Sequence, residues 1–270
     1  MSNCYKAYAK VNVGLKVGQK EKDGFHGIKT YFHLISLSDD LYFDIQDNLK
    51  TTVSIVGNES YLEKGKIDLM EKAALLYSKV TSKTFALSIK IDKKIPNGAG
   101  LGGGSSDCAV VLRFLEEHYS TNVDLFALAL QLGSDVPFFV SQLFAAKGEG
   151  RGQILTPITP VKAKALLFIP ENIKIVTASA YESLDKRKNI DFSLSSWTTD
   201  TESWFSTYSN DFLSIQPLTE CKEKCETFRL MLSGSGACYF ALYNEKLFSP
   251  KLLAEEFKST KIIGINFLNR

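Results

Sequence analysis

The sequence has few of the features that mark secreted or membrane proteins. Its five cysteines are scattered through 270 residues, and an odd set of this kind argues against a disulfide framework. No apolar run approaches the length of a membrane span, and the first residues lack the order typical of a signal peptide. We therefore expect a cytoplasmic protein with reduced cysteines and no membrane partner.

An excess of one charge is also missing. The chain has 32 Lys and Arg against 30 Asp and Glu, interspersed along the sequence, for a net charge of +2. The basic run at residues 186–188 is expected to be a solvated loop, so we predict no nucleic-acid partner. Cys221 and Cys225 would share a helix face, but no second Cys or His pair completes a zinc site, and we predict no protein metal site.

The hydrophobic content of 44% is sufficient for a substantial core. Residues 5–17 alternate apolar and polar side chains, which predicts a strand, and residues 66–80 have a helical apolar stripe at Leu69, Ala73, Leu76 and Val80. Further strands are expected at 30–37, 41–45, 51–56, 164–169, 230–232, 238–242 and 261–266, and helices at 124–132, 177–185, 220–227 and 250–259. The pattern predicts an α+β protein with domains at residues 1–158 and 159–270.

The most informative stretch is a glycine-rich segment at residues 95–107. It has five glycines within seven residues, between a predicted strand at Phe85–Asp92 and a predicted helix at 108–118. Glycine allows left-handed backbone angles and close approach to a ligand, and Ser105 or Ser106 is expected to cap the helix. Free N–H groups at a helix N-terminus favour anions, so the segment predicts a phosphate site.

Other nucleotide-binding motifs are absent. The spacing Gly98-x-Gly100-x-x-Gly103 matches a dinucleotide fingerprint, but residues 124–132 are predicted as a helix where a second parallel strand is needed. No Lys-Ser or Lys-Thr follows the glycines, which excludes a Walker A loop. The chain has no Asp-Phe-Gly and no His-Arg-Asp, which excludes the protein-kinase motif set.

Polar side chains elsewhere are ambiguous when taken singly. Lys10 and Asn12 lie on one face of the first predicted strand, and the simplest interpretation is a solvated face. Phe25 and His26 share a loop, where they offer stacking beside a hydrogen-bonding ring. Asp135 precedes a predicted helical turn and taken alone is a capping residue.

Taken together, these motifs resemble the GHMP kinase superfamily and, within it, the 4-diphosphocytidyl-2-C-methyl-D-erythritol kinases of the non-mevalonate isoprenoid pathway. The resemblance covers nearly the whole chain, and its motifs occur in the family's order. They are Ala9-Lys10-Val11-Asn12, Asp23-Gly24-Phe25-His26, the segment 96–106, Gly133-Ser134-Asp135-Val136-Pro137 and Leu232-Ser233-Gly234-Ser235-Gly236.

This resemblance implies a fold, a reaction and the nucleotide that takes part. The fold is a GHMP kinase fold, with an N-terminal domain like domain 2 of ribosomal protein S5 and a ferredoxin-like C-terminal domain. The reaction is the ATP-dependent phosphorylation of the 2-hydroxyl of 4-diphosphocytidyl-2-C-methyl-D-erythritol, with Mg²⁺ accompanying the nucleotide. The expected ATP-binding residues are Lys93, Pro96, Asn97, Gly98, Ala99, Gly100, Leu101, Gly102, Gly103, Gly104, Ser105 and Ser106.

The resemblance also implies the residues that act on the acceptor. Lys10 and Asp135 match the catalytic pair, and the substrate-binding positions are Asn12, Phe25, His26 and Tyr181. A carboxylate can orient a hydroxyl, and a lysine can stabilise the developing negative charge. Two positions depart from the family pattern: Phe25 replaces the usual Tyr, and Asp107 stands where Asn is common.

Three alternatives stay open. One is a GHMP kinase for another small alcohol such as homoserine or mevalonate, against which Phe25 and His26 argue, because those substrates have no base to stack. Another is a non-catalytic ligand sensor, against which Lys10 and Asp135 argue. The third is a dinucleotide-binding dehydrogenase, disfavoured by the missing strand. We expect a small-molecule partner and a monomer or weak homodimer.

Overall fold

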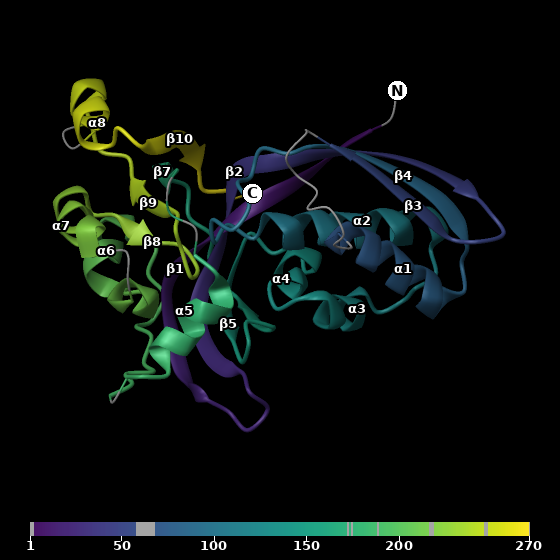
Figure 1. The fold of residues 1–270 in the computed structure, drawn as a ribbon, viewed down its shortest axis with the longest axis horizontal. Coiled ribbons are helices and arrows are strands. Elements are labelled where there is room, and N and C mark those ends of the chain that lie inside the picture. Colours follow the sequence, from purple (N-terminus) through teal and green to yellow (C-terminus); the bar gives the residue numbers. More distant parts are fainter. Residues whose placement is uncertain are drawn as a thin grey trace. The chain divides into compact units, whose positions relative to one another are not determined.

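A computed structural model of the chain describes residues 3–57, 68–171, 173, 175–187, 189–215, 219–245 and 248–269. The chain forms two compact units, and each is assembled from separate stretches of sequence (Figure 1). Unit 1 comprises Met1–Ala9, Leu37–Asn97 and Gly102–Leu143, and unit 2 comprises Lys10–Ser36, Gly98–Leu101 and Phe144–Arg270. Mixed strands and helices confirm the predicted α+β class.

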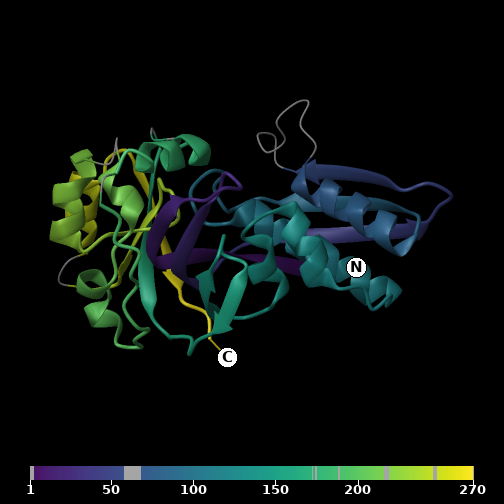
Figure 2. The same ribbon diagram turned by 90° about the horizontal axis from the view of Figure 1, so that it is seen from below.

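Unit 1 is a sheet covered by helices. In it β3 (Thr52–Gly57) pairs in parallel with β4 (Phe85–Asp92), and β4 pairs antiparallel with the C-terminal part of β2 (His26–Asp47). The helices lie on one side of β3 and β4, and Figure 2 shows them from that side. They are α1 (Leu69–Thr81), α2 (Gly103–Tyr119), α3 (Leu125–Leu132) and α4 (Val136–Val140).

The core of unit 1 follows the alternation in β4. Phe85, Leu87, Ile89 and Ile91 are buried, as a two-residue period requires for a strand with one covered face. The predicted stripe on α1 is right only at Ala73, since the other buried residues there are Met70, Ala74 and Tyr77. The Tyr77 hydroxyl donates to Glu116 Oε2 at 2.8 Å, so a polar anchor on α2 sets which face of α1 turns inward.

One predicted turn is also wrong. The sequence predicts two strands around residues 38–40, but β2 continues through them for 22 residues. The reason is Asp39, which is fully buried and whose Oδ1 accepts hydrogen bonds from the backbone N–H groups of Lys94 and Ile95 at 2.5 and 2.8 Å. Aspartate favours turns when its side chain bonds to nearby backbone N–H groups. The Asp39 carboxylate instead bonds to N–H groups of a distant segment, so the strand continues through it.

Unit 2 contains the C-terminal part of β1 (Cys4–Lys20) and the N-terminal part of β2. It also contains β5 (Ala145–Glu149) and β6 (Ile154–Pro157). Thr30 to His33 of β2 pair antiparallel with β5, and β5 pairs with β6. Strands β5 and β6 were not predicted, since Ala145–Glu149 reads Ala-Ala-Lys-Gly-Glu and has no β-branched residue.

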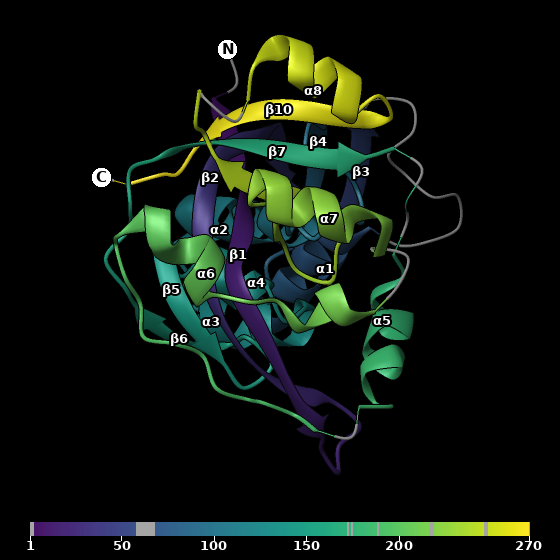
Figure 3. The same cartoon turned by 90° about the vertical axis from the view of Figure 1, so that its left-hand side faces the viewer.

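A second sheet completes unit 2 in the order β10-β7-β9-β8 (Figure 3). Its strands are β7 (Lys164–Pro170), β8 (Met231–Leu232), β9 (Tyr239–Leu242) and β10 (Thr260–Asn266), and the connecting helices include α5 (Thr177–Leu184), α7 (Thr219–Phe228) and α8 (Pro250–Glu256). Numbered within this sheet the order is 4-1-3-2 with β-α-β-β-α-β connectivity, which is the ferredoxin-like arrangement. Phe168, Phe228 and Phe248 join its core.

A buried histidine links two segments of unit 2. His33 has no exposed surface, its Nδ1 bonds to the Leu34 carbonyl at 2.9 Å, and its Nε2 accepts from the Val161 N–H at 3.0 Å. Burial disfavours the charged ring and lowers the pKa of His33 from 6.5 to about 4.

We predict that His33 makes the protein sensitive to acid. A lowered histidine pKa contributes stability that is present above pH 6.5 and is lost as the pH falls towards 4, by roughly 3 kcal/mol over the whole window. His33→Gln, which retains an acceptor, should flatten the dependence of the unfolding free energy on pH in that window. Urea unfolding of both proteins from pH 4 to 7.5 measures it, and parallel curves would contradict the assignment.

Candidate active site

The glycine-rich loop turns by means of alternate left-handed glycines. The φ angles of Gly98, Gly100 and Gly102 are 68°, 74° and 71°, while the residues between them have negative φ. Backbone that alternates in this way arranges N–H groups into a concave site for anions. The loop is also packed from outside, since a Cβ at Gly100 would lie 2.2 Å from the Ser233 carbonyl oxygen.

Helix α2 begins at the end of this loop, and its start differs from the prediction. Neither Ser105 nor Ser106 is the cap; the N-cap is Gly102, and no side chain bonds to the first helical N–H groups. Since the Ser106 N–H is the one that bonds back to the Gly102 carbonyl, at 2.9 Å, the preceding N–H groups face outward along the helix axis. The N-terminus of this 17-residue helix has no side-chain cap and is therefore suited to binding a phosphate.

The entrance to the loop is fixed by a buried ion cluster in unit 1. The Lys93 ammonium donates to Asp39 Oδ2 at 2.5 Å and to Asp107 Oδ2 at 2.6 Å, and neither carboxylate has exposed side-chain surface. Burial opposes the charge on Lys93, but the two carboxylates outweigh it and raise the lysine pKa. Burial raises the pKa of Asp107 to about 8, against the attraction of Lys93.

This cluster changes the interpretation of Lys93 and Asp107. Lys93 was predicted to contact ATP, and its side chain is 8% exposed because it bridges β2 to α2. Asp107 points into this cluster, and its Oδ1 has no hydrogen-bond partner among the described residues. Because Asp107 stands where the family commonly has Asn, this chain has an additional titratable group beside the glycine-rich loop.

The Lys10 side chain occupies a buried position in unit 2. It lies on β1, is 3% exposed, and its Nζ donates to Asn12 Oδ1 at 2.6 Å and to the Gly100 carbonyl at 3.0 Å. The Phe32 ring lies beside it, with the ring centroid 5.6 Å from Nζ. The predicted solvated face of β1 is therefore a buried polar site against the glycine-rich loop.

Asn12 and Ser233 complete this arrangement. Asn12 is 1% exposed, and its Nδ2 donates to Thr30 Oγ1 at 2.9 Å, so its side chain is held between Thr30 and Lys10. Ser233 Oγ accepts from the Asn12 N–H at 3.3 Å and donates to the Gly100 carbonyl at 3.0 Å. Three motifs far apart in sequence thus meet at one carbonyl oxygen.

Asp135 lies in unit 1 at the start of α4. It has helical backbone angles, φ −88° and ψ −17°, is half-buried, and its side chain makes no capping hydrogen bond, so the capping role is wrong. Arg113 of α2 donates to the Phe139 carbonyl at 2.8 Å, which ties α4 to the helix that follows the glycine-rich loop. Lys10 and Asp135 belong to different units, and their action as a pair stays a prediction.

The predicted base-binding residues lie together in unit 2. His26 stacks on Tyr181 with ring centroids 5.2 Å apart, its Nδ1 lies 3.0 Å from the Gly18 carbonyl oxygen, and its Nε2 lies 3.1 Å from Asp185 Oδ1. Both ring nitrogens are engaged, so the ring holds Tyr181 and the loop rather than offering a spare nitrogen.

Phe25 is exposed, and its ring contacts a cation. Its ring is 52% exposed, and the Arg151 guanidinium lies 3.6 Å from its centroid. Arg151 is fixed by Asp23 Oδ2 at 2.5 Å. Arg151 was not predicted as a site residue, because its contact with Phe25 spans 126 positions and leaves no local pattern in the sequence.

The chain is similar to known proteins both in sequence and in fold. Residues 68–142 match the family described as GHMP kinases N terminal domain. A solved 4-(cytidine 5'-diphospho)-2C-methyl-D-erythritol kinase superposes with a TM-score of 0.79 at 28% identity, over 99% of this chain and 100% of that one. A homoserine kinase from Cytophaga hutchinsonii shares the fold, with a TM-score of 0.68 at 15% identity over 98% of this chain and 95% of that one. The fold and the glycine-rich loop define a GHMP kinase.

Curated relatives define the family more narrowly. The 4-diphosphocytidyl-2-C-methyl-D-erythritol kinase of Pseudothermotoga lettingae is 34% identical over 262 residues, covering 89% of this chain and 92% of the relative. That of Thermus thermophilus is 33% identical over 246 residues, covering 87% and 86%. The chain belongs to the 4-diphosphocytidyl-2-C-methyl-D-erythritol kinase family.

Substitutions at two adjacent glycines can test phosphate binding and core packing separately. A Cβ at Gly104 meets nothing within 4 Å, whereas one at Gly103 would lie 2.9 Å from Ile95 Cγ2. We predict that Gly104→Val weakens ATP binding at least tenfold, because its side chain blocks the phosphate path, while the melting temperature stays unchanged. Gly103→Ala should instead lower the melting temperature. Titration calorimetry and thermal unfolding measure both, and unaltered ATP affinity in folded Gly104→Val would contradict the phosphate site.

Asp107 should give the protein a second pH dependence, opposite in sign to that of His33. The folded state retains a proton up to about pH 8 that the unfolded state releases near pH 4, so this group's contribution to stability falls as the pH rises between those values. Relative to Asp107→Asn, the wild-type protein should therefore become progressively less stable as the pH rises across that window. Paired denaturant titrations from pH 4.5 to 9 measure it; a constant difference between the two proteins would mean that Asp107 is ionised throughout.

Proposed function

We propose that this chain transfers the γ-phosphoryl group of ATP to the 2-hydroxyl of 4-diphosphocytidyl-2-C-methyl-D-erythritol, forming the 2-phosphate and ADP. Family membership supports the reaction, since several relatives that align over most of the chain carry this name. The observation that carries the proposal is the buried Lys10 ammonium bonded to the Gly100 carbonyl of the glycine-rich loop. It joins a cation to a phosphate cradle, which is what phosphoryl transfer requires.

In this mechanism the chain supplies positioning and charge. The N–H groups at the start of α2 bind the phosphates, and the side-chain-free loop lets them approach the backbone. Lys10 stabilises negative charge that develops on the transferring group or on the attacking oxygen. Asp135 accepts or orients the proton of the acceptor hydroxyl.

Mg²⁺ would accompany ATP and neutralise phosphate charge. Among the described residues no group of three or more His, Cys, Asp or Glu side chains is placed to hold a metal ion. Mg²⁺ usually keeps phosphate and water ligands and takes only one or two protein carboxylates. Its main ligands here would therefore be oxygens of the nucleotide.

The cytidine end is assigned to Phe25, His26 and Tyr181, with Asn12 towards the reacting end because its side chain bonds to Lys10. The exposed face of Phe25 can stack on a base, and stacking of this kind is worth roughly 1–3 kcal/mol. A cytoplasmic monomer or weak homodimer remains part of the proposal. No described helix is long and apolar enough to cross a membrane.

A panel of acceptors tests the proposed function. ADP release should be fast with the cytidine-diphosphate-linked polyol and at background with homoserine, mevalonate or no acceptor. Phosphorylation of homoserine or mevalonate instead would favour another GHMP kinase activity. ATP binding without turnover on any acceptor would favour a ligand sensor.

The role of Asp135 gives a sharper prediction. Asp135→Asn should lower kcat by about 10²–10⁴-fold, the usual contribution of general-base catalysis, and should leave the ATP dissociation constant almost unchanged. Ser134→Ala is the matched control, since that side chain is an exposed neighbour. Lys10→Met should act likewise, and the double variant should lose much less than the product of the two effects. Near-normal turnover in folded Asp135→Asn would remove Asp135 from the mechanism.

A further inference from the structure

The loop at Ser233 needs a support of its own. Ser233 bonds to both Asn12 and the Gly100 carbonyl, so its position sets where that carbonyl meets Lys10. The loop itself is short and glycine-rich, with positive φ at Gly234 and Gly236. A segment of this kind has many accessible backbone conformations and is held in one of them by its contacts.

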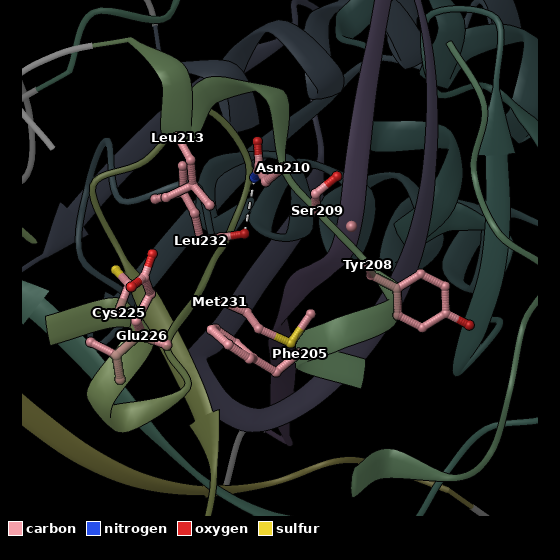
Figure 4. A pocket seen from close by; sticks show the side chains of 11 residues that line it. Phe205, Tyr208, Ser209, Asn210, Leu213, Cys225, Glu226, Met231 and Leu232 are labelled. Atoms are coloured by element: carbon pink, nitrogen blue, oxygen red, sulfur yellow. Dashed lines mark hydrogen bonds between the residues drawn. The ribbon is translucent and has the colours of Figure 1, made fainter. Parts of the chain in front are cut away.

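Asn210 supplies two of these contacts from a distant part of unit 2. Its Nδ2 donates to the Leu232 carbonyl and to the Gly234 carbonyl, both at 2.9 Å, one on each side of Ser233. Figure 4 shows the first of these bonds from Asn210 to Leu232. The two N–H groups of one amide therefore hold the carbonyl groups of the residues on either side of the serine.

Asn210 is itself rigidly placed. It is 5% exposed, and its Oδ1 accepts from the Phe212 N–H at 3.0 Å, which caps the short helix that follows. The adjacent backbone is anchored to β1 by the Leu15 N–H, which bonds to the Ser209 carbonyl at 2.9 Å. Gly14 permits this approach, since a Cβ there would lie 3.0 Å from Tyr208 Cβ.

The space next to Asn210 is a largely apolar pocket of about 210 Å³, lined also by Phe205, Leu213 and Met231 (Figure 4). An apolar lining offers few hydrogen bonds to the carbonyls of the loop. Loss of the Asn210 amide would therefore leave the buried Leu232 carbonyl and the partly buried Gly234 carbonyl each short of a donor, which favours a shift of the loop.

We infer that Asn210 is a positioning residue for phosphoryl transfer: its amide fixes the Ser233 loop, which fixes the Gly100 carbonyl against the Lys10 ammonium. The inference rests on the proposed function, because it assigns Asn210 to the same reaction. Lys10 must be held within a fraction of an ångström to act on the transition state, so a loosened loop should reduce turnover more than binding.

The test uses Asn210→Ser, in which a hydroxyl retains the helix cap but is too short to reach the loop. Asn210→Asp, which has the shape of Asn and keeps the cap acceptor, is the second variant. The matched control is Tyr208→Phe, which loses a hydroxyl that donates to the Ser196 carbonyl and accepts from the Thr198 N–H in the same segment. We expect kcat to fall about 10–100-fold in folded Asn210→Ser with the ATP dissociation constant changed less than threefold, and kcat to stay normal in the control.

Two further measurements separate the inference from the proposed function. Combined with Ser233→Ala, Asn210→Ser should cause little additional loss, because both act through one loop. Amide hydrogen exchange should quicken at residues 231–238 and 98–101 in Asn210→Ser and not in Tyr208→Phe, whichever acceptor the enzyme uses. Normal kcat, or unaltered exchange at residues 98–101, would overturn the positioning role. Absence of wild-type turnover with the cytidine substrate, with the exchange result intact, would overturn the substrate alone.

Discussion

The arrangement of the site depends on holding the Lys10 ammonium away from water. A buried charge is tolerated when oxygen atoms around it replace its hydration, and Asn12 Oδ1 and the Gly100 carbonyl do so at 2.6 and 3.0 Å. Gly100 must adopt a left-handed conformation for this geometry, and Ser233 donates to the same carbonyl. The strand, the glycine-rich loop and the Gly-Ser loop are consequently coupled through one oxygen atom.

A second buried ammonium, that of Lys93, is stabilised by acidic side chains instead of neutral oxygen atoms. Lys93 is held by the carboxyl groups of Asp39 and Asp107, so its charge joins β2, the loop entrance and α2. Pairs of this kind add little net stability, because the desolvation of the charges offsets their attraction. Their effect here is geometric: Asp39 also bonds to the backbone of Lys94 and Ile95, which sets where the chain enters the glycine-rich loop.

Patterns that depend on near neighbours could be predicted from the sequence. The two-residue alternation of β4 and the helix at α3 follow from burial on one face and from the capping aspartate Asp124. Predictions failed where a distant group changed the local preference. The Asp39 carboxylate bonds to the backbone of a distant segment instead of forming a turn. Helix α2 begins after Gly102 and has no side-chain cap, so neither predicted serine is the cap. The apolar face predicted for α1 is only partly right, because the Tyr77 hydroxyl has partners on α2 that the periodicity of α1 does not reveal.

Sequence alone specifies the chemical groups and their order: a lysine and an asparagine on one strand, a glycine-rich loop before a helix, and an aspartate before Val-Pro. These suffice for the family, because backbone freedom and strand or helix period are local properties. The partner of each polar group is set by the folded chain. Asn12 bonds to Lys10 and Thr30, His26 lies against Asp185, and Asn210 holds the Ser233 loop. The backbone N–H of Asn12 and its acceptor Ser233 Oγ are 221 positions apart, and a hydrogen bond acts over about 3 Å, so folding alone brings such groups together.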